Sequence, residues 1–63
     1  MTEDQDERFR KLRHDLSNPL AAILAETQLL LLNADSLDAE VLRALREIEG
    51  LSRRMRDILQ QRI

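Results

Sequence analysis

The segment His14-Asp15-Leu16-Ser17-Asn18-Pro19-Leu20 holds the residues of this chain that are best suited to chemistry, including its only histidine and its only proline. Near pH 7 a histidine side chain is typically a neutral imidazole, which is a good nucleophile. Asp15 supplies a carboxylate and Asn18 a carboxamide close to that ring. Phosphoryl transfer depends mainly on positioning and charge stabilisation, so one exposed imidazole with these neighbours is enough to accept a phosphoryl group.

The rest of the sequence excludes several other kinds of site. The chain has no cysteine and a single histidine, which argues against a thiolate or multi-histidine metal centre. Gly50 is the only glycine, so no glycine-rich loop is present to hold a nucleotide phosphate. We therefore expect the chain to bind no metal or cofactor by itself and not to phosphorylate itself from ATP.

Pro19 interrupts a pattern that otherwise predicts one continuous helix. A proline in a helix interior removes a backbone hydrogen bond and clashes with the carbonyl four residues earlier, here that of Asp15, at a cost of about 3 kcal/mol. Two interpretations stay open. The proline either bends the helix next to His14 for a functional reason, or it is a tolerated kink.

Composition predicts a single small domain, residues 1–63, built from amphipathic helices. Of the 63 residues 43% are hydrophobic and 35% are charged, but Phe9 is the only aromatic residue. Such a chain has little bulk for a core of its own, so self-association is expected. The net charge of −2 argues against nucleic-acid binding, and the apolar runs are too short for a membrane span, so we expect no membrane contact.

Apolar residues recur at seven-residue steps in two segments, which predicts a helix over about 3–33, a turn at about 34–36 and a helix over about 37–61. The first set is Phe9, Leu16, Ile23 and Leu30, flanked by Leu12, Leu20 and Leu24; the second is Val41, Ile48 and Met55, interleaved with Leu37, Ala44, Leu51 and Ile58. The turn-forming residues of 33–36 separate the two sets, and either Asp35 or Ser36 is expected to cap the second helix.

Charge predicts that the two helices run antiparallel. Acidic residues gather at the start of the first helix, and four arginines gather near the end of the second: Arg53, Arg54, Arg56 and Arg62. Four leucines in a row at 29–32 cannot all face one partner helix. The predicted fold is therefore all-α, an antiparallel helical hairpin that pairs with a second copy as a homodimeric four-helix bundle, with the leucine run at its closed end.

His14 is expected on the exposed side of the first helix, opposite the stripe that contains Leu16. Asn18 lies one turn further on the same surface. Further along the helix, on the C-terminal side of Asn18, the surface contains small residues that would let another helix approach closely. The expected partner-binding positions are Ala21, Ala22, Ala25, Glu26 and Leu29. Neighbouring residues point about 100° apart on a helix, so we expect Asp15 to reach His14 only in a swung rotamer.

The segment 14–20, followed by Ala21-Ala22-Ile23, resembles the H-box of sensor histidine kinases, found in their dimerisation and histidine-phosphotransfer domain of the HisKA type. The family pattern is His, an acid, two variable residues, Thr or Asn, Pro and an apolar residue. This resemblance implies that His14 accepts phosphate through Nε2, Asp15 orients the ring and helps to remove its proton, and Asn18 positions water for a phosphatase reaction. Pro19 would allow bending between signalling states.

The same resemblance implies the partners. These are a second copy of the chain, a separate catalytic domain that binds ATP and magnesium, and the receiver domain of a response regulator, whose aspartate takes the phosphate. It implies a cytoplasmic location, although a parent protein could be membrane-anchored. Two alternatives stay open: a purely structural dimerisation hairpin, and a histidine phosphotransfer (HPt-type) relay protein.

For two positions in the second helix, the sequence predicts which residues of the first helix lie beside them. If the hairpin is centred near Asp35, Gly50 lies level with Pro19 and could make room for the bent backbone; the alternative is a weak spot without a role. The same alignment places Arg56 near His14, where it could steady a phosphoryl group, or pair with the acidic first turn.

Overall fold

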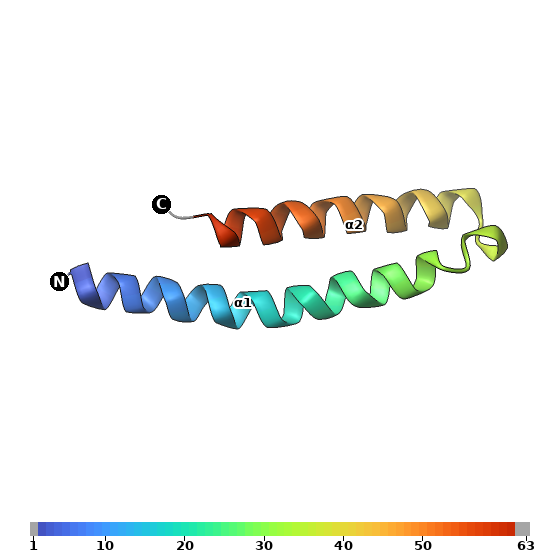
Figure 1. The fold of residues 1–63 in the computed structure, drawn as a ribbon. Helices are drawn as coiled ribbons and strands as arrows, with labels where there is room; N and C mark the ends of the chain where they lie inside the picture. The colour runs from blue at the N-terminus through green and yellow to red at the C-terminus, as the bar shows by residue number, and fades with distance from the viewer. Residues whose placement is uncertain (1, 62–63) are drawn as a thin grey trace.

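The chain forms a long antiparallel hairpin of two helices (Figure 1). The computed structural model describes residues 2–61, with side chains from Asp4 to Gln61. Helix α1 spans Thr2–Leu31, a short 3-10 turn η1 spans Ala34–Ser36, and helix α2 spans Ala39–Gln60. The described part measures 53 × 16 × 12 Å, the dimensions of two helices side by side. The predicted all-α antiparallel hairpin is confirmed.

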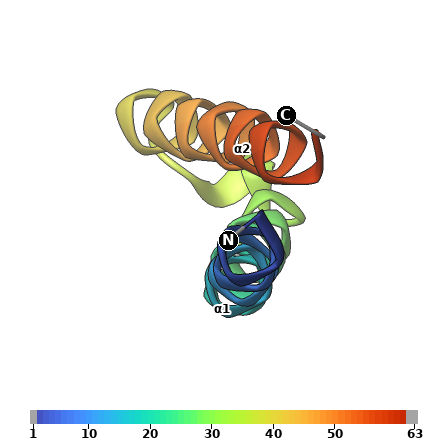
Figure 2. The same cartoon turned by 90° about the vertical axis from the view of Figure 1, so that its left-hand side faces the viewer.

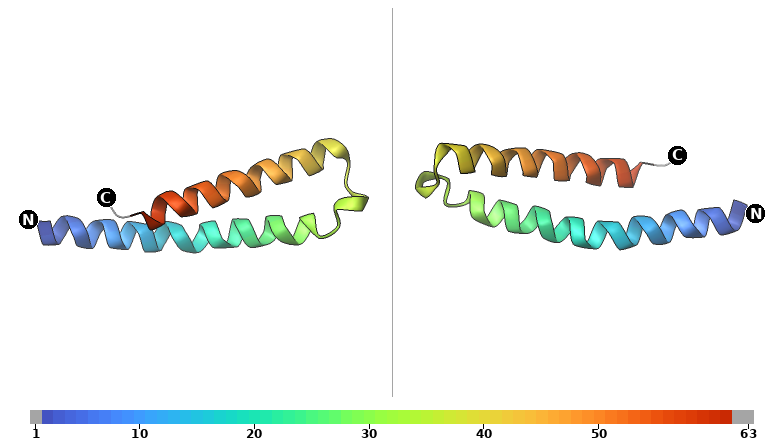
Figure 3. Two further views of the ribbon diagram at one scale, coloured as in Figure 1. Left: turned by 45° about the horizontal axis from the view of Figure 1, so that its top comes forward. Right: turned by 180° about the vertical axis from the view of Figure 1, so that it is seen from behind.

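Helix α1 continues through Pro19 instead of ending there. The ribbon of α1 bows gently along its length (Figures 1 and 3). A proline inside a helix is a recognised cause of bending, because its ring crowds the preceding turn and one backbone hydrogen bond is lost. The residue that follows, Leu20, is the only buried apolar side chain among the described residues, with 5% of its surface exposed. The turn that contains the proline is therefore anchored directly by hydrophobic burial.

The connection between the helices is longer than predicted, and α2 begins later. The 3-10 turn is closed by the Ser36 hydroxyl, which donates to the Asn33 carbonyl at 2.9 Å, while Leu37 is extended. Asp38 occupies the N-cap position, and its carbonyl accepts the first bond of α2 from the Leu42 amide at 2.8 Å. The predicted cap at Asp35 or Ser36 is wrong, because both residues belong to the 3-10 turn.

The inner faces of the two helices form a thin contact layer. Besides Leu20, its buried members are small and polar, namely Thr27 and Ser52. The Thr27 hydroxyl donates to the Ile23 carbonyl at 2.6 Å, which satisfies it within its own helix. Half-buried residues complete the layer: Arg13, Leu24, Leu31, Ala34, Leu37, Leu42, Leu45, Glu49 and Leu59.

Both helices leave a second apolar face uncovered. Each of its side chains is at least 40% exposed, and the set follows the predicted apolar pattern: Phe9, Leu12, Leu16, Ile23, Leu30, Val41, Ile48, Leu51, Met55 and Ile58. We call this set the outer stripe. Of the leucine run only Leu31 is half-buried in the hairpin, while Leu29, Leu30 and Leu32 are exposed. Viewed from the open end, the two helices form a single layer with both broad sides uncovered (Figure 2).

Among the described residues, one side-chain hydrogen bond crosses between the helices. The Gln28 amide donates to Glu49 Oε2 at 3.5 Å, and Arg53 Nη2 lies 3.3 Å from the same oxygen. Because Glu49 meets Gln28, nine residues beyond Pro19, its neighbour Gly50 is not level with the proline. A methyl group added at Gly50 would meet no atom within 4 Å. The prediction that Gly50 makes room for the bent backbone is therefore wrong.

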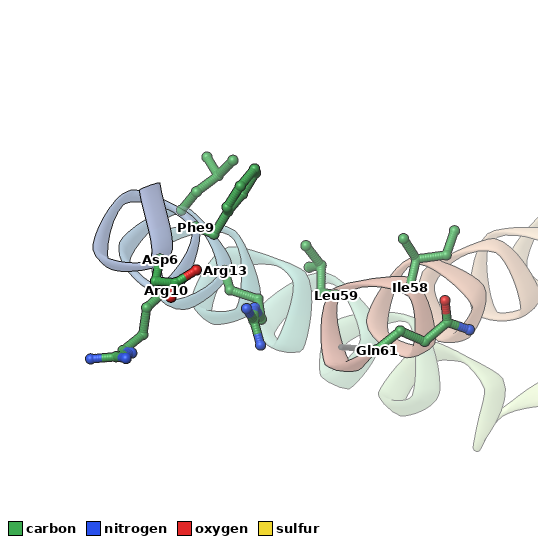
Figure 4. A pocket seen from close by; sticks show the side chains of 8 residues that line it. Asp6, Phe9, Arg10, Arg13, Ile58, Leu59 and Gln61 are labelled. Atoms are coloured by element: carbon green, nitrogen blue, oxygen red, sulfur yellow. The ribbon is translucent and has the colours of Figure 1, made fainter. Parts of the chain in front are cut away.

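The arginines of α2 also differ from expectation. The last turn of α2 holds no basic residue, because Arg53, Arg54 and Arg56 lie earlier in the helix, and Arg62 lies outside the described residues. Arg56 Nη2 is 3.5 Å from Asp57 Oδ1, so within the described part it pairs with its own neighbour rather than with His14 or the acidic turn. The end of α2 lies beside α1, which extends further at its N-terminal end (Figure 1). Residues of both helices line a shallow recess there (Figure 4): Asp6, Phe9, Arg10, Leu12, Arg13, Ile58, Leu59 and Gln61.

The open surroundings of Gly50 lead to a stability prediction. Replacing Gly50 with alanine removes backbone freedom from the unfolded chain without a steric cost, so G50A should raise the free energy of unfolding by about 1 kcal/mol. Thermal unfolding followed by circular dichroism measures the change as a higher Tm. An unchanged or lower Tm would mean that another surface packs against this position in the assembled protein.

Candidate functional site

The predicted nucleophile is fully accessible. His14 lies on α1, and 75% of its side chain is exposed, as the helical register predicted. It lies on the surface opposite the outer stripe and away from the inner layer, so neither hairpin pairing nor burial of the outer stripe would cover it. An imidazole in this position can meet a reactant held by another domain.

Asp15 reaches the ring of His14 directly. Its Oδ1 atom is 3.5 Å from Nδ1 of His14, and the Asp15 side chain is 56% exposed. This distance is longer than a well-formed hydrogen bond but close enough for the carboxylate to favour a proton on Nδ1. With the proton on Nδ1, the lone pair remains on Nε2. The sequence predicted that Asp15 reaches His14 only in a swung rotamer, and the structure places the carboxylate at this distance from the ring.

Asn18 and Pro19 are both exposed, one turn after His14. Helical side chains lean toward the N-terminus of their helix, so a residue at i+4 leans toward the residue it follows. The Asn18 carboxamide is therefore placed on the C-terminal side of the imidazole. The roles predicted for these residues, water positioning and bending, stay predictions.

All five predicted partner-binding residues are exposed on α1: Ala21, Ala22, Ala25, Glu26 and Leu29. Sequence reasoning missed Leu32, which is the most exposed large apolar residue described, at 79%. It lies three residues after Leu29 and extends the same surface to the turn. Helical spacing is the signal that could have found it. Leu32 was expected only at the closed end of the bundle, whereas Leu29 was also predicted to bind a partner. We call Ala22, Ala25, Leu29 and Leu32 the lower face.

The described residues contain no cluster of three or more side chains that could hold a metal ion. Neither α1 nor α2, over the residues described, combines the length and apolar character needed to cross a membrane. The described site thus consists of one nucleophile, one carboxylate, one carboxamide and an adjacent apolar surface. Such a site can receive a group carried by a partner.

Comparison with known protein families gives a match that covers most of the chain. The sequence model of the family described as His Kinase A (phospho-acceptor) domain matches residues 4–61, which include both helices and the turn almost entirely. No curated protein and no solved structure matches the chain.

The contact between His14 and Asp15 predicts the protonation pattern of the neutral ring. Replacing the carboxylate in D15N should lower the fraction of imidazole that carries its proton on Nδ1, because the amide attracts that proton less strongly. Nitrogen chemical shifts of His14 measured by NMR report both tautomers. The variant D35N removes the same charge in the 3-10 turn between the helices, far from His14, and should leave the shifts unchanged. Equal shifts in wild type and D15N would contradict the assigned contact.

Proposed function

Because the chain belongs to the His Kinase A (phospho-acceptor) domain family, whose members are phosphate-accepting and dimerising modules of histidine kinases, we propose that His14 is the residue phosphorylated here. The observation that carries this assignment is the exposed imidazole, whose Nδ1 faces a carboxylate and whose Nε2 is left for attack. His14 is also the only histidine of the chain. The proposed function is therefore reception of a phosphoryl group on His14 Nε2.

The chemistry follows from the two ring nitrogens. Nε2 attacks the γ-phosphorus of ATP, a bond forms between nitrogen and phosphorus, and the bond from that phosphorus to the bridging oxygen breaks, releasing ADP. The ring then carries an extra positive charge, which it loses as the Nδ1 proton departs toward Asp15 or water. Asp15 thus holds the reactive tautomer and stabilises the developing positive charge.

ATP and its magnesium ion are assigned to a separate catalytic domain, acting in cis or in trans. The chain contributes the acceptor but has one glycine and no glycine-rich phosphate loop. The position of His14 on an exposed helix surface suits delivery from outside. The separate catalytic domain then binds and positions ATP, and this chain supplies the nucleophile.

Dimerisation is assigned to the outer stripe. A hairpin whose described residues include one buried leucine has too small a core for a stable domain on its own, whereas burial of ten exposed apolar side chains against a second copy would provide one. Seven-residue spacing on both helices suits packing of four helices around a shared axis. We propose a homodimeric four-helix bundle that keeps His14 outside.

The lower face is proposed to receive the receiver domain of a response regulator, whose aspartate takes the phosphate from His14. Ala22 and Ala25 are small enough to admit a partner helix, while Leu29 and Leu32 offer exposed apolar contacts. Asn18 lies between this surface and His14, where it would orient a water molecule for the reverse, phosphatase reaction. A cytoplasmic site of action follows from the partners proposed.

The assignment of His14 is tested with an active histidine-kinase catalytic domain supplied in trans with labelled ATP. We expect acid-labile, alkali-stable label on the wild-type chain and none on H14Q, because glutamine offers no nucleophilic ring nitrogen. Adding receiver domains then tests whether the label moves on. Wild-type chain that stays unlabelled by kinase domains active on other substrates would favour the purely structural hairpin.

The outer stripe gives a second prediction. A lysine at Ile48 would place an unpaired charge inside the proposed bundle, so I48K should shift the protein from dimer to monomer and lower its Tm. Analytical ultracentrifugation measures the mass. Q60K adds the same side chain at an exposed position of α2 and should remain dimeric. A wild-type monomer would instead favour the HPt-type relay protein.

A further inference from the structure

The carboxylate that orients His14 also creates an electrostatic difficulty. Asp15 lies 3.5 Å from the ring, and a phosphoryl group arriving at Nε2 carries negative charge of its own. Two anionic groups would then share one exposed imidazole, which raises the energy of the phosphorylated state. A nearby cation would offset this repulsion, and the turn before His14 contains basic side chains at Arg10, Lys11 and Arg13.

Building on the proposed function, we propose that Lys11 contacts the phosphoryl group on His14 and offsets its repulsion from Asp15. Lys11 is three residues before His14, so the two are neighbours on the surface of α1. Helical side chains lean toward the N-terminus, which directs the His14 ring over the turn that contains Lys11. The flexible lysine stem allows its ammonium group to meet phosphate oxygens there.

The helical register separates Lys11 from its basic neighbour. At 100° per residue, Lys11 and Asn18 lie about 60° and 40° to one side of His14, the side away from α2, and Asp15 lies on that side too. Arg10 lies about 40° to the other side. It lines the recess at the open end of the hairpin together with Asp6 and residues of α2 (Figure 4). Arg13 is half-buried in the inner layer, so of the basic residues in the turn before His14 only Lys11 shares the surface of Asp15 and Asn18.

Lys11 is also available for this contact. It is exposed, and among the ion pairs within the described residues none involves it. The acidic side chains spaced one turn from it are Glu7 and Asp15. The carboxylate of Asp15 belongs to the site itself, so a phosphoryl group on His14 would lie near both charges, and the ammonium group can balance the two anions together.

The test uses phosphoramidate, a small donor that phosphorylates histidine without a catalytic domain. Nε2 of His14 attacks the phosphorus, the phosphorus–nitrogen bond of the donor breaks, ammonia leaves, and the ring gives up its Nδ1 proton. Phosphorus NMR follows the rate of phosphohistidine formation on the full chain. At low salt, K11M should lower this rate by up to about fivefold, the size expected for an exposed ion pair.

Three controls separate a direct contact from a structural effect. K11R should restore most of the rate, because arginine keeps the charge. R10M removes the same charge one residue away and should react like wild type. The difference between K11M and wild type should shrink as salt is raised, since exposed charges are screened. Circular dichroism melts should show equal Tm values for K11M and R10M.

Each outcome decides the role of Lys11. A K11M rate equal to that of R10M at low salt, or a deficit that K11R does not repair, overturns it. If wild type is labelled by a kinase domain and K11M reacts normally with phosphoramidate, the proposed function stands and only the lysine contact is lost. If His14 of the wild-type chain takes no phosphate from either donor, both proposals are overturned.

Discussion

Burial of apolar surface is the constraint on which this structure depends. Each helix carries an inner and an outer apolar face, but two helices lying side by side can cover only the inner ones. Among the described residues the inner layer has one buried leucine, while ten large apolar side chains of the outer stripe remain exposed. Hydrophobic burial supplies most of the free energy of folding, so the hairpin is half of a core, and its stability is tied to whatever covers the other half.

The position of His14 follows from the same constraint. The spacing of apolar residues places the inner layer and the outer stripe on two sides of α1. The remaining surface of α1 holds His14 and the lower face. Pro19 and Leu20 are consecutive, so the backbone feature that bends α1 and the side chain that fixes it to α2 occupy one turn. His14, the proposed phosphate acceptor, can then lie in solvent while the backbone beneath it is held by burial.

Sequence was sufficient for the features set by periodicity and residue type. The seven-residue steps predicted both helices, the outer stripe and the exposure of His14. The sequence alone was insufficient where several local backbone conformations have similar energies. Asp35, Ser36 and Asp38 can each cap a helix, and only the 3-10 turn at Ala34–Ser36 selects the last. That longer connection moves the register of α2, which displaced Gly50 and Arg56 from their expected neighbours. The contact between His14 and Asp15 depends on a rotamer, which spacing does not determine.

Thr27 and Ser52 have a consequence for movement between the helices. Both are buried in the inner layer, and the Thr27 hydroxyl is satisfied within α1 rather than by α2. A small side chain forms fewer dispersion contacts than a leucine, and a hydroxyl bonded to its own helix loses nothing when the opposite helix moves. At these two positions, shear of α1 along α2 therefore breaks few favourable contacts, whereas the leucines of the layer resist it. The link from Gln28 to Glu49 is the described side-chain hydrogen bond between the helices that such a displacement must break.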